Sequence, residues 1–300
     1  MSTAPNLYRT DQSLRFLKNA AEIEPTGGAL GAFVSGIDAS LPVDPATLLK
    51  LRQALNDHHI LIFSGQKLTD EAFLRLATYF GAVFIPPEDV PVLASDNAGK
   101  TPDIIPIANV EGGYTGNGEL HAHIDHQWTP YPSAGSLLYA LEVPETGGDT
   151  TWINLALAYD TLDEATRHLI DGLQLITYNP FKRKPGDPRP RYRLDPKALP
   201  SSEAFPHPLV RTHPESGRKL LYLSAATEVE IVGWEPQEGA ALIERLRTHL
   251  AEPRFAYRHH WRVGDIVFWD NQATVHARTP FPAESRRVLK RISLAGGRPF

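Results

Sequence analysis

Short β-rich runs separated by turn residues recur along this chain, and they constrain its fold more than any other feature of the sequence. The runs lie at residues 59–63, 136–143, 219–223, 266–269 and 287–294. Helical patterns interrupt them at residues 44–56, 69–80, 156–173 and 236–250. Many short strands with a few helices predict a mainly β fold with some α-helix, in which a double-stranded β-helix (jelly roll) core is covered by helices.

The 300 residues, of which 42% are hydrophobic, are enough for one large domain. No long period repeats, so we expect a single domain over residues 1–300. Two segments resist regular structure. Residues 85–120 are rich in glycine toward their end, and residues 180–208 carry eight prolines and a cationic excess. Loops of this length are usually functional or disordered, and we expect both to act as lids.

Composition excludes several classes of protein. The chain has 30 Lys+Arg against 35 Asp+Glu and no dense basic run, so a nucleic-acid partner is not expected. It has no cysteine, which excludes disulfides, thiolate zinc sites and iron–sulfur clusters. Any metal must therefore bind through histidines and carboxylates. No apolar run is long enough for a membrane span, and the first residues do not form a signal peptide, so we expect a cytoplasmic protein without a membrane partner.

The densest group of possible metal ligands is His121-Ala122-His123-Ile124-Asp125-His126. In an extended chain residues i and i+2 point the same way, so His123 and Asp125 can present an imidazole and a carboxylate to one ion. A third ligand can come from His276, which follows an apolar strand. Two histidines and one carboxylate on one face of an octahedron leave open positions, as in non-haem Fe(II) oxygenases.

Alternatives remain open at this motif. A His-x-Asp pair alone occurs often by chance. On a regular strand His121 shares the face of His123 and could replace it as a ligand, whereas His126 is predicted to point the other way.

Cations alternate near the C-terminus. Strand geometry puts Arg287 and Arg291 on one face and Arg286 and Lys290 on the other. A buried guanidinium without a partner is costly, so an inward-facing arginine implies an anion beside it. The alternative is an edge strand whose arginines are solvated.

These residues together resemble the taurine dioxygenase/TfdA-like family of Fe(II)/2-oxoglutarate-dependent dioxygenases. The family's pattern is a His-x-Asp pair, then a threonine, then a distant histidine and then an arginine. Here 24 residues lie between Asp125 and Thr150, and ten lie between His276 and Arg287. The resemblance covers nearly the whole chain, including residues 58–81, 207–214 and 268–271.

The resemblance implies a role for each matching residue. Fe(II) would be held by His123, Asp125 and His276, and 2-oxoglutarate would chelate that iron. Thr150 and Arg287 would bind the distal carboxylate of 2-oxoglutarate, which suits a hydroxyl donor and a planar guanidinium. Arg291 and His126 are expected to contact the prime substrate, with Arg291 meeting its anionic group.

The implied reaction is the oxidation of an unactivated C–H bond of a small anionic organic substrate by O2, most often a hydroxylation, with 2-oxoglutarate converted to succinate and CO2. Desaturation or cyclisation after the same hydrogen abstraction stays open. So do a non-catalytic anion-binding jelly roll and a zinc hydrolase. Pro86 stands where the taurine enzyme has a sulfonate-binding histidine, so we expect an anion larger than taurine. The resemblance also allows a homo-oligomer.

Overall fold

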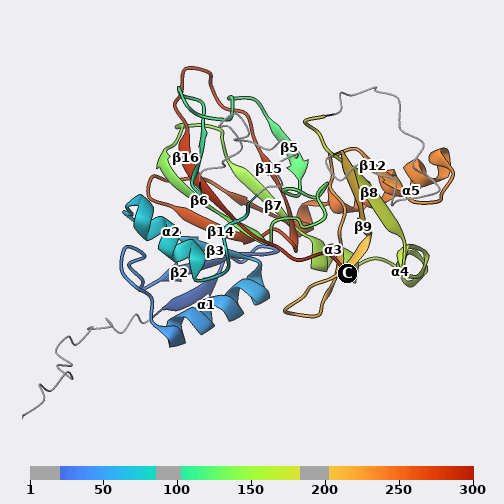
Figure 1. The fold of residues 1–300 in the computed structure, drawn as a ribbon, viewed down its shortest axis with the longest axis horizontal. Helices are drawn as coiled ribbons and strands as arrows, with labels where there is room; N and C mark the ends of the chain where they lie inside the picture. The colour runs from blue at the N-terminus through green and yellow to red at the C-terminus, as the bar shows by residue number, and fades with distance from the viewer. Residues whose placement is uncertain (1–20, 86–102, 183–202) are drawn as a thin grey trace, which may run out of the picture.

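Two β-sheets make up the central part of the computed structural model, which describes residues 21–85, 103–182 and 203–300 (Figure 1). The larger sheet has the order β1 (Glu22–Pro25), β2 (Ala32–Ser35), β3 (Ile60–Phe63), β14 (Ile266–Asp270), β6 (Gly135–Glu142), β16 (Val288–Leu294) and β4 (Ile105–Ala108). The smaller sheet has the order β13 (Ala256–His259), β7 (Thr150–Asn154), β15 (Thr274–Arg278) and β5 (Leu120–His123). Neighbouring strands in both sheets are antiparallel except β2 and β3. The predicted mainly β fold is confirmed.

The inner faces of the two sheets pack against each other. Trp152 of β7 lies 5.8 Å from Trp269 of β14 between ring centroids, and Trp269 lies 5.0 Å from His276 of β15. Apolar side chains of the larger sheet, among them Ile62 and Leu138, complete this core. Burial of these faces is the main favourable term that holds the two sheets together.

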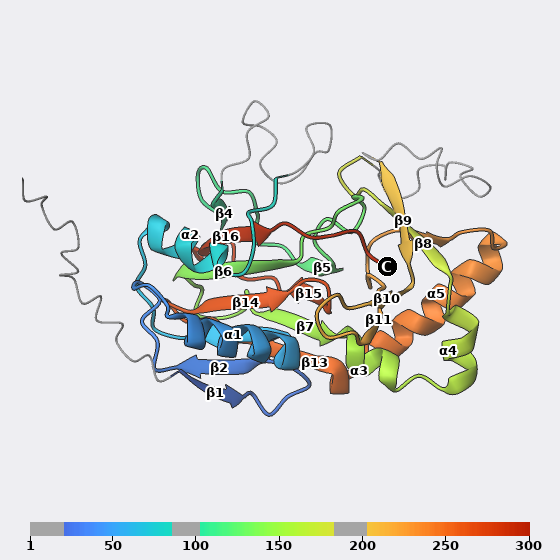
Figure 2. The ribbon, with the colours of Figure 1, turned by 60° about the horizontal axis from the view of Figure 1, so that its bottom comes forward.

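Two helices cover the outer face of the larger sheet (Figure 2). Helix α1 (Pro45–His58) begins at Asp44, whose carboxylate accepts hydrogen bonds from the backbone N–H groups of residues 46 and 47. Helix α2 (Asp70–Thr78) begins at the Thr69 cap. Leu51 of α1 and Phe73 of α2 lie fully buried in a second apolar core with the outer side chains of the sheet. Both helices agree with the sequence prediction.

The remaining elements form a third group beside the sheets, at the end that carries the C-terminus (Figures 1 and 2). The helices are α3 (Leu155–Asp160), α4 (Glu164–Ile170), α5 (Pro236–Leu250) and a short 3-10 helix (Pro253–Phe255). The strands are β8 (Gln174–Tyr178), β9 (Ala204–Pro208) and β12 (Val229–Ile231), with the separate pair β10 (Val210–Thr212) and β11 (Lys219–Leu221). Apart from β9, these elements share a core of their own that reaches Ile124, beside the His-x-Asp motif.

Three sequence predictions were wrong in part. The single helix expected over 156–173 is two helices, because Asp163 caps a new one by accepting from the Thr166 backbone N–H at 2.8 Å. The loop expected over 85–120 contains β4, whose pairing with β16 outweighs its weak local propensity. The loop expected over 180–208 contains β9. Residues 86–102 and 183–202 of the two expected lids lie outside the described residues.

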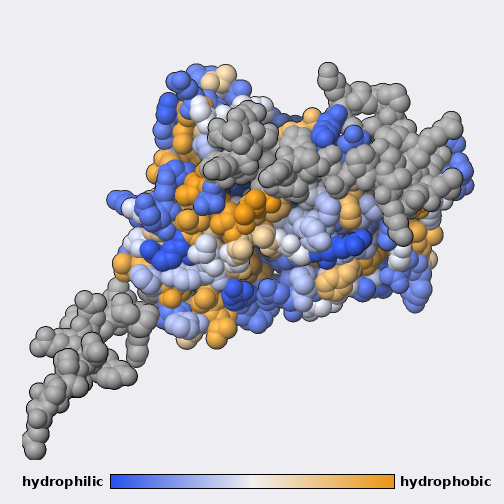
Figure 3. Space-filling view, in the orientation of Figure 1, coloured by the Kyte–Doolittle hydropathy of each residue, from blue (hydrophilic) through white to orange (hydrophobic). Residues whose placement is uncertain are grey.

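Hydrophobic residues gather near the centre of the face seen in Figure 3, and hydrophilic residues are spread over much of the rest. No helix in the described ranges has the length and apolar character needed to cross a bilayer. The longest of them, α5, has 15 residues.

Candidate active site

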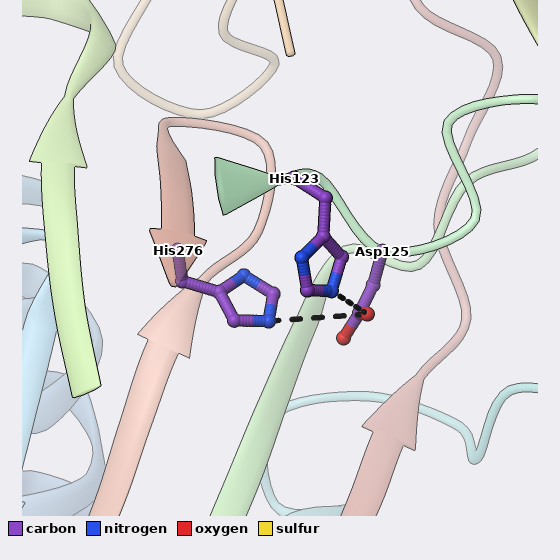
Figure 4. Close-up of side chains that lie close together, drawn as sticks. All are labelled: His123, Asp125 and His276. Atoms are coloured by element: carbon purple, nitrogen blue, oxygen red, sulfur yellow. Dashed lines mark ion pairs between the residues drawn. The ribbon is translucent and has the colours of Figure 1, made fainter. Parts of the chain in front are cut away.

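Strands β5 and β15 bring the predicted metal ligands together. His123 and His276 are direct cross-strand partners, so their imidazoles stand on the same face of the smaller sheet. Asp125 follows β5 and turns back toward both rings (Figure 4). Its Oδ1 lies 3.4 Å from His123 Nε2 and 3.9 Å from His276 Nε2. One possible ligand atom from each residue lies within 4.8 Å of the other two.

These distances fit a divalent metal, since ligands at right angles and about 2.1 Å from an ion lie about 3 Å apart. His123 Nδ1 lies 2.8 Å from the His121 carbonyl, so that nitrogen carries the hydrogen and Nε2 presents its lone pair. Burial, assisted by repulsion from His123, lowers the pKa of His276 to about 3 and keeps its ring neutral. Burial by itself lowers the pKa of His123, but the hydrogen bond to Asp125 and the charge of Asp125 outweigh burial and raise it, so a metal ion would replace a proton on this ring. Two imidazoles and a carboxylate are a suitable donor set for Fe(II).

Asp125 is held as a carboxylate. Burial by itself raises the pKa of this group, but the Arg291 guanidinium and the two histidines outweigh burial and hold the pKa well below its ordinary value. Arg291 Nη1 lies 3.4 Å from Asp125 Oδ2.

Asn271, directly after β14, fixes the backbone that carries Asp125. Its side-chain oxygen accepts from the Asp125 N–H at 3.1 Å, and its Nδ2 donates to the Asp125 carbonyl at 3.0 Å. The same Nδ2 also donates to the Ser133 carbonyl at 2.9 Å. The amide is completely buried. We did not predict this role from the sequence, although a polar residue after an all-buried strand is a usable signal.

A cavity of about 500 Å³ opens beside the three ligands. Thr150, Arg287 and Arg291 line it with them, as do apolar side chains of both sheets. The sequence-predicted cofactor residues and metal ligands therefore share one cavity.

Thr150 is 3% exposed and lines this cavity. Trp261 Nε1–H donates to Thr150 Oγ1 at 2.9 Å. Because the oxygen already accepts this bond, the hydroxyl proton is free to be donated to a further acceptor. A carboxylate is an acceptor of that kind. Trp261 is a second residue that sequence reasoning missed, because the contact joins positions far apart in the chain.

Arg287 lies 2% exposed just before β16, and Arg291 is 7% exposed. Their common face looks inward, which decides between the two alternatives that the sequence left open. Arg287 Nε donates to the Gly148 carbonyl at 3.1 Å, and its Cζ lies 5.9 Å from the Trp261 ring. Burial, followed by the charge of Arg278, lowers the pKa of Arg287 to about 9. No carboxylate of the described residues lies within ion-pair distance of it. A buried guanidinium in this state calls for an anionic ligand, which fits the distal carboxylate of a 2-oxo diacid.

Comparison with known proteins identifies the family. A family model described as "Taurine catabolism dioxygenase TauD, TfdA family" matches residues 22–293. The chain belongs to this family. It is 32% identical over 275 residues to an alkylsulfatase of Acinetobacter baylyi, covering 90% of this chain and 83% of that protein. It is 29% identical over 302 residues to the (S)-phenoxypropionate/alpha-ketoglutarate-dioxygenase of Delftia acidovorans, covering 93% of this chain and 97% of that protein.

A solved structure agrees with this assignment. AAD-2 in complex with Mn(II) and N-oxalylglycine matches with a TM-score of 0.72 at 27% identity, covering 93% of this chain and 98% of that chain. This TauD/TfdA protein is a 2-oxoglutarate-dependent dioxygenase that uses Fe(II), 2-oxoglutarate and O2.

The structure also places the other two histidines of the motif, His121 and His126. His126 lines the cavity, so the expectation that it faces away was wrong: its φ of 60° takes it out of strand alternation. Its ring stacks on Phe84 at 4.1 Å, and its Nδ1 lies 3.2 Å from Ser133 Oγ. His121 is exposed, lies 3.6 Å from Glu119, and is not in the metal group.

Proposed function

We propose that this TauD/TfdA protein hydroxylates a C–H bond of a small organic monoanion that carries an apolar body. In this proposal His123, Asp125 and His276 hold Fe(II), and Thr150 and Arg287 hold the distal carboxylate of 2-oxoglutarate. Arg291 and His126 contact the prime substrate. The observation that carries the proposal is one cavity that holds a His-Asp-His group beside Arg287, a buried arginine with no carboxylate of the described residues within ion-pair distance. We also propose that residues 1–300 form a single domain, because the family match spans 22–293.

When bound, the iron and 2-oxoglutarate supply the oxidising power for O2 activation and leave succinate and CO2. The residues of the chain position the metal and 2-oxoglutarate and balance their charges. The three ligand residues line the cavity and would hold the metal ion there. Asn271 holds the Asp125 backbone, and Trp261 orients the Thr150 hydroxyl. The apolar walls exclude water from the position of the substrate C–H bond.

The charge of the cavity favours a monoanionic substrate. Arg278, Arg287 and Arg291 line it with Glu119 and Asp125, which leaves one net positive charge among the described lining residues. The two positive charges of a divalent metal and the two negative charges of 2-oxoglutarate sum to zero. The remaining positive charge matches one anionic group on the prime substrate, and a neutral substrate would leave it uncompensated in a region of low dielectric.

The apolar residues of the cavity lining are the reason for proposing a substrate with an apolar body. Trp128 and Phe181 meet edge to face at 5.7 Å, and Leu138 and Trp269 line the cavity from the larger sheet. The names of the two relatives above pair an anionic group with an alkyl or a phenoxy body. Both shapes suit these walls better than taurine does, since taurine has only a short chain and a cationic end.

A substrate panel tests the proposal. Purified protein with Fe(II), 2-oxoglutarate and ascorbate is incubated with an alkyl sulfate, an aryloxypropionate, their uncharged alcohol and methyl-ester counterparts, and taurine. Succinate and the oxidised product are quantified by mass spectrometry, with Asp125→Ala as the inactive control. We expect succinate formation to depend on the anionic members. Equal turnover of the uncharged counterparts, or no member raising succinate above the level without substrate, would overturn the proposed substrate class.

The product mass also separates the chemical outcomes. Gain of one oxygen indicates hydroxylation, and loss of two hydrogens indicates desaturation or cyclisation. Binding of an anion without succinate formation would favour the non-catalytic alternative.

A further inference from the structure

A third buried guanidinium, that of Arg278, stands at the cofactor end of the cavity. It follows His276 by two residues on β15, so both side chains lie on the cavity face. Its Cα is the direct cross-strand partner of Thr150 on β7. Arg278 is 5% exposed. Strand register therefore places it beside the residue that is proposed to bind the distal carboxylate.

Arg278 also holds part of the cavity wall. Its Nη2 donates to the carbonyl of Gly116 at 2.9 Å and to the carbonyl of Gly118. Both belong to residues 112–118, which we call the glycine-rich segment. Tyr114, Thr115 and Gly116 of this segment line the cavity. One side chain thus joins the segment to the metal-bearing strand.

The remaining N–H donors of this guanidinium have no hydrogen-bond partner among the described residues, although its Cζ lies 5.2 Å from the centre of the Phe281 ring. Nε and Nη1 are buried without a hydrogen bond, and no carboxylate of the described residues lies within ion-pair distance of Arg278. Arg287 has no carboxylate partner either, and the two charges are close enough for Arg278 to disfavour the charged form of Arg287. Two neighbouring guanidiniums in this state repel each other across a low dielectric, and one anion between them removes the repulsion.

We propose that Arg278 is a second guanidinium for the distal carboxylate of 2-oxoglutarate, and that carboxylate binding fixes the glycine-rich segment over the cavity. This inference rests on the proposed function and adds a residue and a coupling to it. Neutralisation by the carboxylate lets Arg278 and Arg287 approach the same ligand while Nη2 keeps its bonds to Gly116 and Gly118. The co-substrate then orders one wall of the site that receives the prime substrate.

Hydrogen exchange measures this coupling without turnover. The backbone N–H groups of Gly113, Tyr114 and Thr115 donate to carbonyls of residues 110, 106 and 108, so their exchange reports opening of the segment. Mn(II)-loaded protein is compared with and without 2-oxoglutarate, and affinity for 2-oxoglutarate is measured by calorimetry on the same samples. We expect the ligand to slow exchange in residues 112–118 of the natural protein several-fold.

Three variants make the test specific. Arg278→Gln removes the charge, and we expect about tenfold weaker 2-oxoglutarate binding and no exchange response in the segment. Arg278→Lys keeps the charge but loses the planar fork, and we expect an intermediate effect. Arg286→Gln is the matched control: Arg286 is exposed, pairs with Glu142 at 2.7 Å and neighbours Arg287 in sequence. This control should behave as the natural protein does.

The outcomes separate this inference from the proposed function. If the natural protein binds 2-oxoglutarate and both Arg278 variants bind it equally well, the inference is overturned and the proposed function stands. Unchanged 2-oxoglutarate affinity with weaker binding of an anionic prime substrate would assign Arg278 to that substrate instead, which also overturns it. If metal-loaded natural protein fails to bind 2-oxoglutarate, the proposed function itself fails.

Discussion

The hydrogen bond from Trp261 to Thr150 gives a quantitative prediction about the cofactor site. Trp261→Phe removes a donor that lies 2.9 Å from Thr150 Oγ1, with both residues buried. The phenyl ring still fills most of the space beneath Arg287. The main loss is therefore the bond that orients the hydroxyl proton toward the proposed carboxylate.

A buried hydrogen bond contributes about 1 kcal/mol net, and leaving its acceptor unpaired adds a similar cost. Only part of this cost falls on ligand binding, because free protein also loses the bond. We expect 2-oxoglutarate affinity to weaken by about 1 kcal/mol, which is roughly fivefold in Kd. Calorimetric titration of Mn(II)-loaded protein resolves a change of this size.

The matched control is Trp152→Phe. Trp152 is fully buried in the same core, but its Nε1 has no hydrogen-bond partner among the described residues. The substitution removes the same volume without removing a bond, so 2-oxoglutarate affinity should stay within twofold. Unchanged affinity in Trp261→Phe, or an equal loss in Trp152→Phe, would refute the reasoning.

Three further predictions follow from the structure. Asn271→Ala frees the Asp125 backbone, and we expect metal affinity to fall about 10- to 100-fold in competition with a chelating dye; unchanged affinity would contradict the positioning role. Arg291→Gln should raise KM for an anionic substrate at least about tenfold in steady-state assays while KM for its uncharged counterpart changes little, and equal effects on both would argue against anion recognition. Burial lowers the pKa of His207 to about 4 from an ordinary 6.5, so the unfolded chain binds a proton that the folded chain does not, and stability present above pH 6.5 is lost as the pH falls toward 4. His207→Gln should reduce this loss by about 2 kcal/mol between pH 7 and pH 5 in urea unfolding, and an unchanged pH slope would show that His207 is not its source.

Local chemistry explains what the sequence predicted correctly. His123 and Asp125 are two residues apart, and a chain without cysteine can bind a metal only through such groups. Strand alternation was sufficient to place Arg287 and Arg291 on one face, although it left open whether that face looks inward. These inferences need only neighbouring residues and the geometry of an extended chain.

The features that were missed depend on long-range contacts or unusual backbone. The register that pairs Arg278 with Thr150 cannot be read from either segment alone, and neither can the bond from Trp261 to Thr150. The direction of the His126 side chain was mispredicted because its positive φ breaks strand alternation. Strand β4 was not predicted because it lies in a segment rich in proline and glycine, and its pairing with β16 outweighs the low strand propensity of that segment.

Anaerobic titration of the Fe(II)-loaded protein with 2-oxoglutarate tests the central claim most directly. Chelation of iron by the 2-oxo acid produces a weak visible charge-transfer band. We predict that the band saturates at one ligand per chain, disappears in Asp125→Ala and requires far more ligand in Arg287→Gln that still binds iron. A folded, iron-loaded natural protein that shows no band at any 2-oxoglutarate concentration would contradict the account.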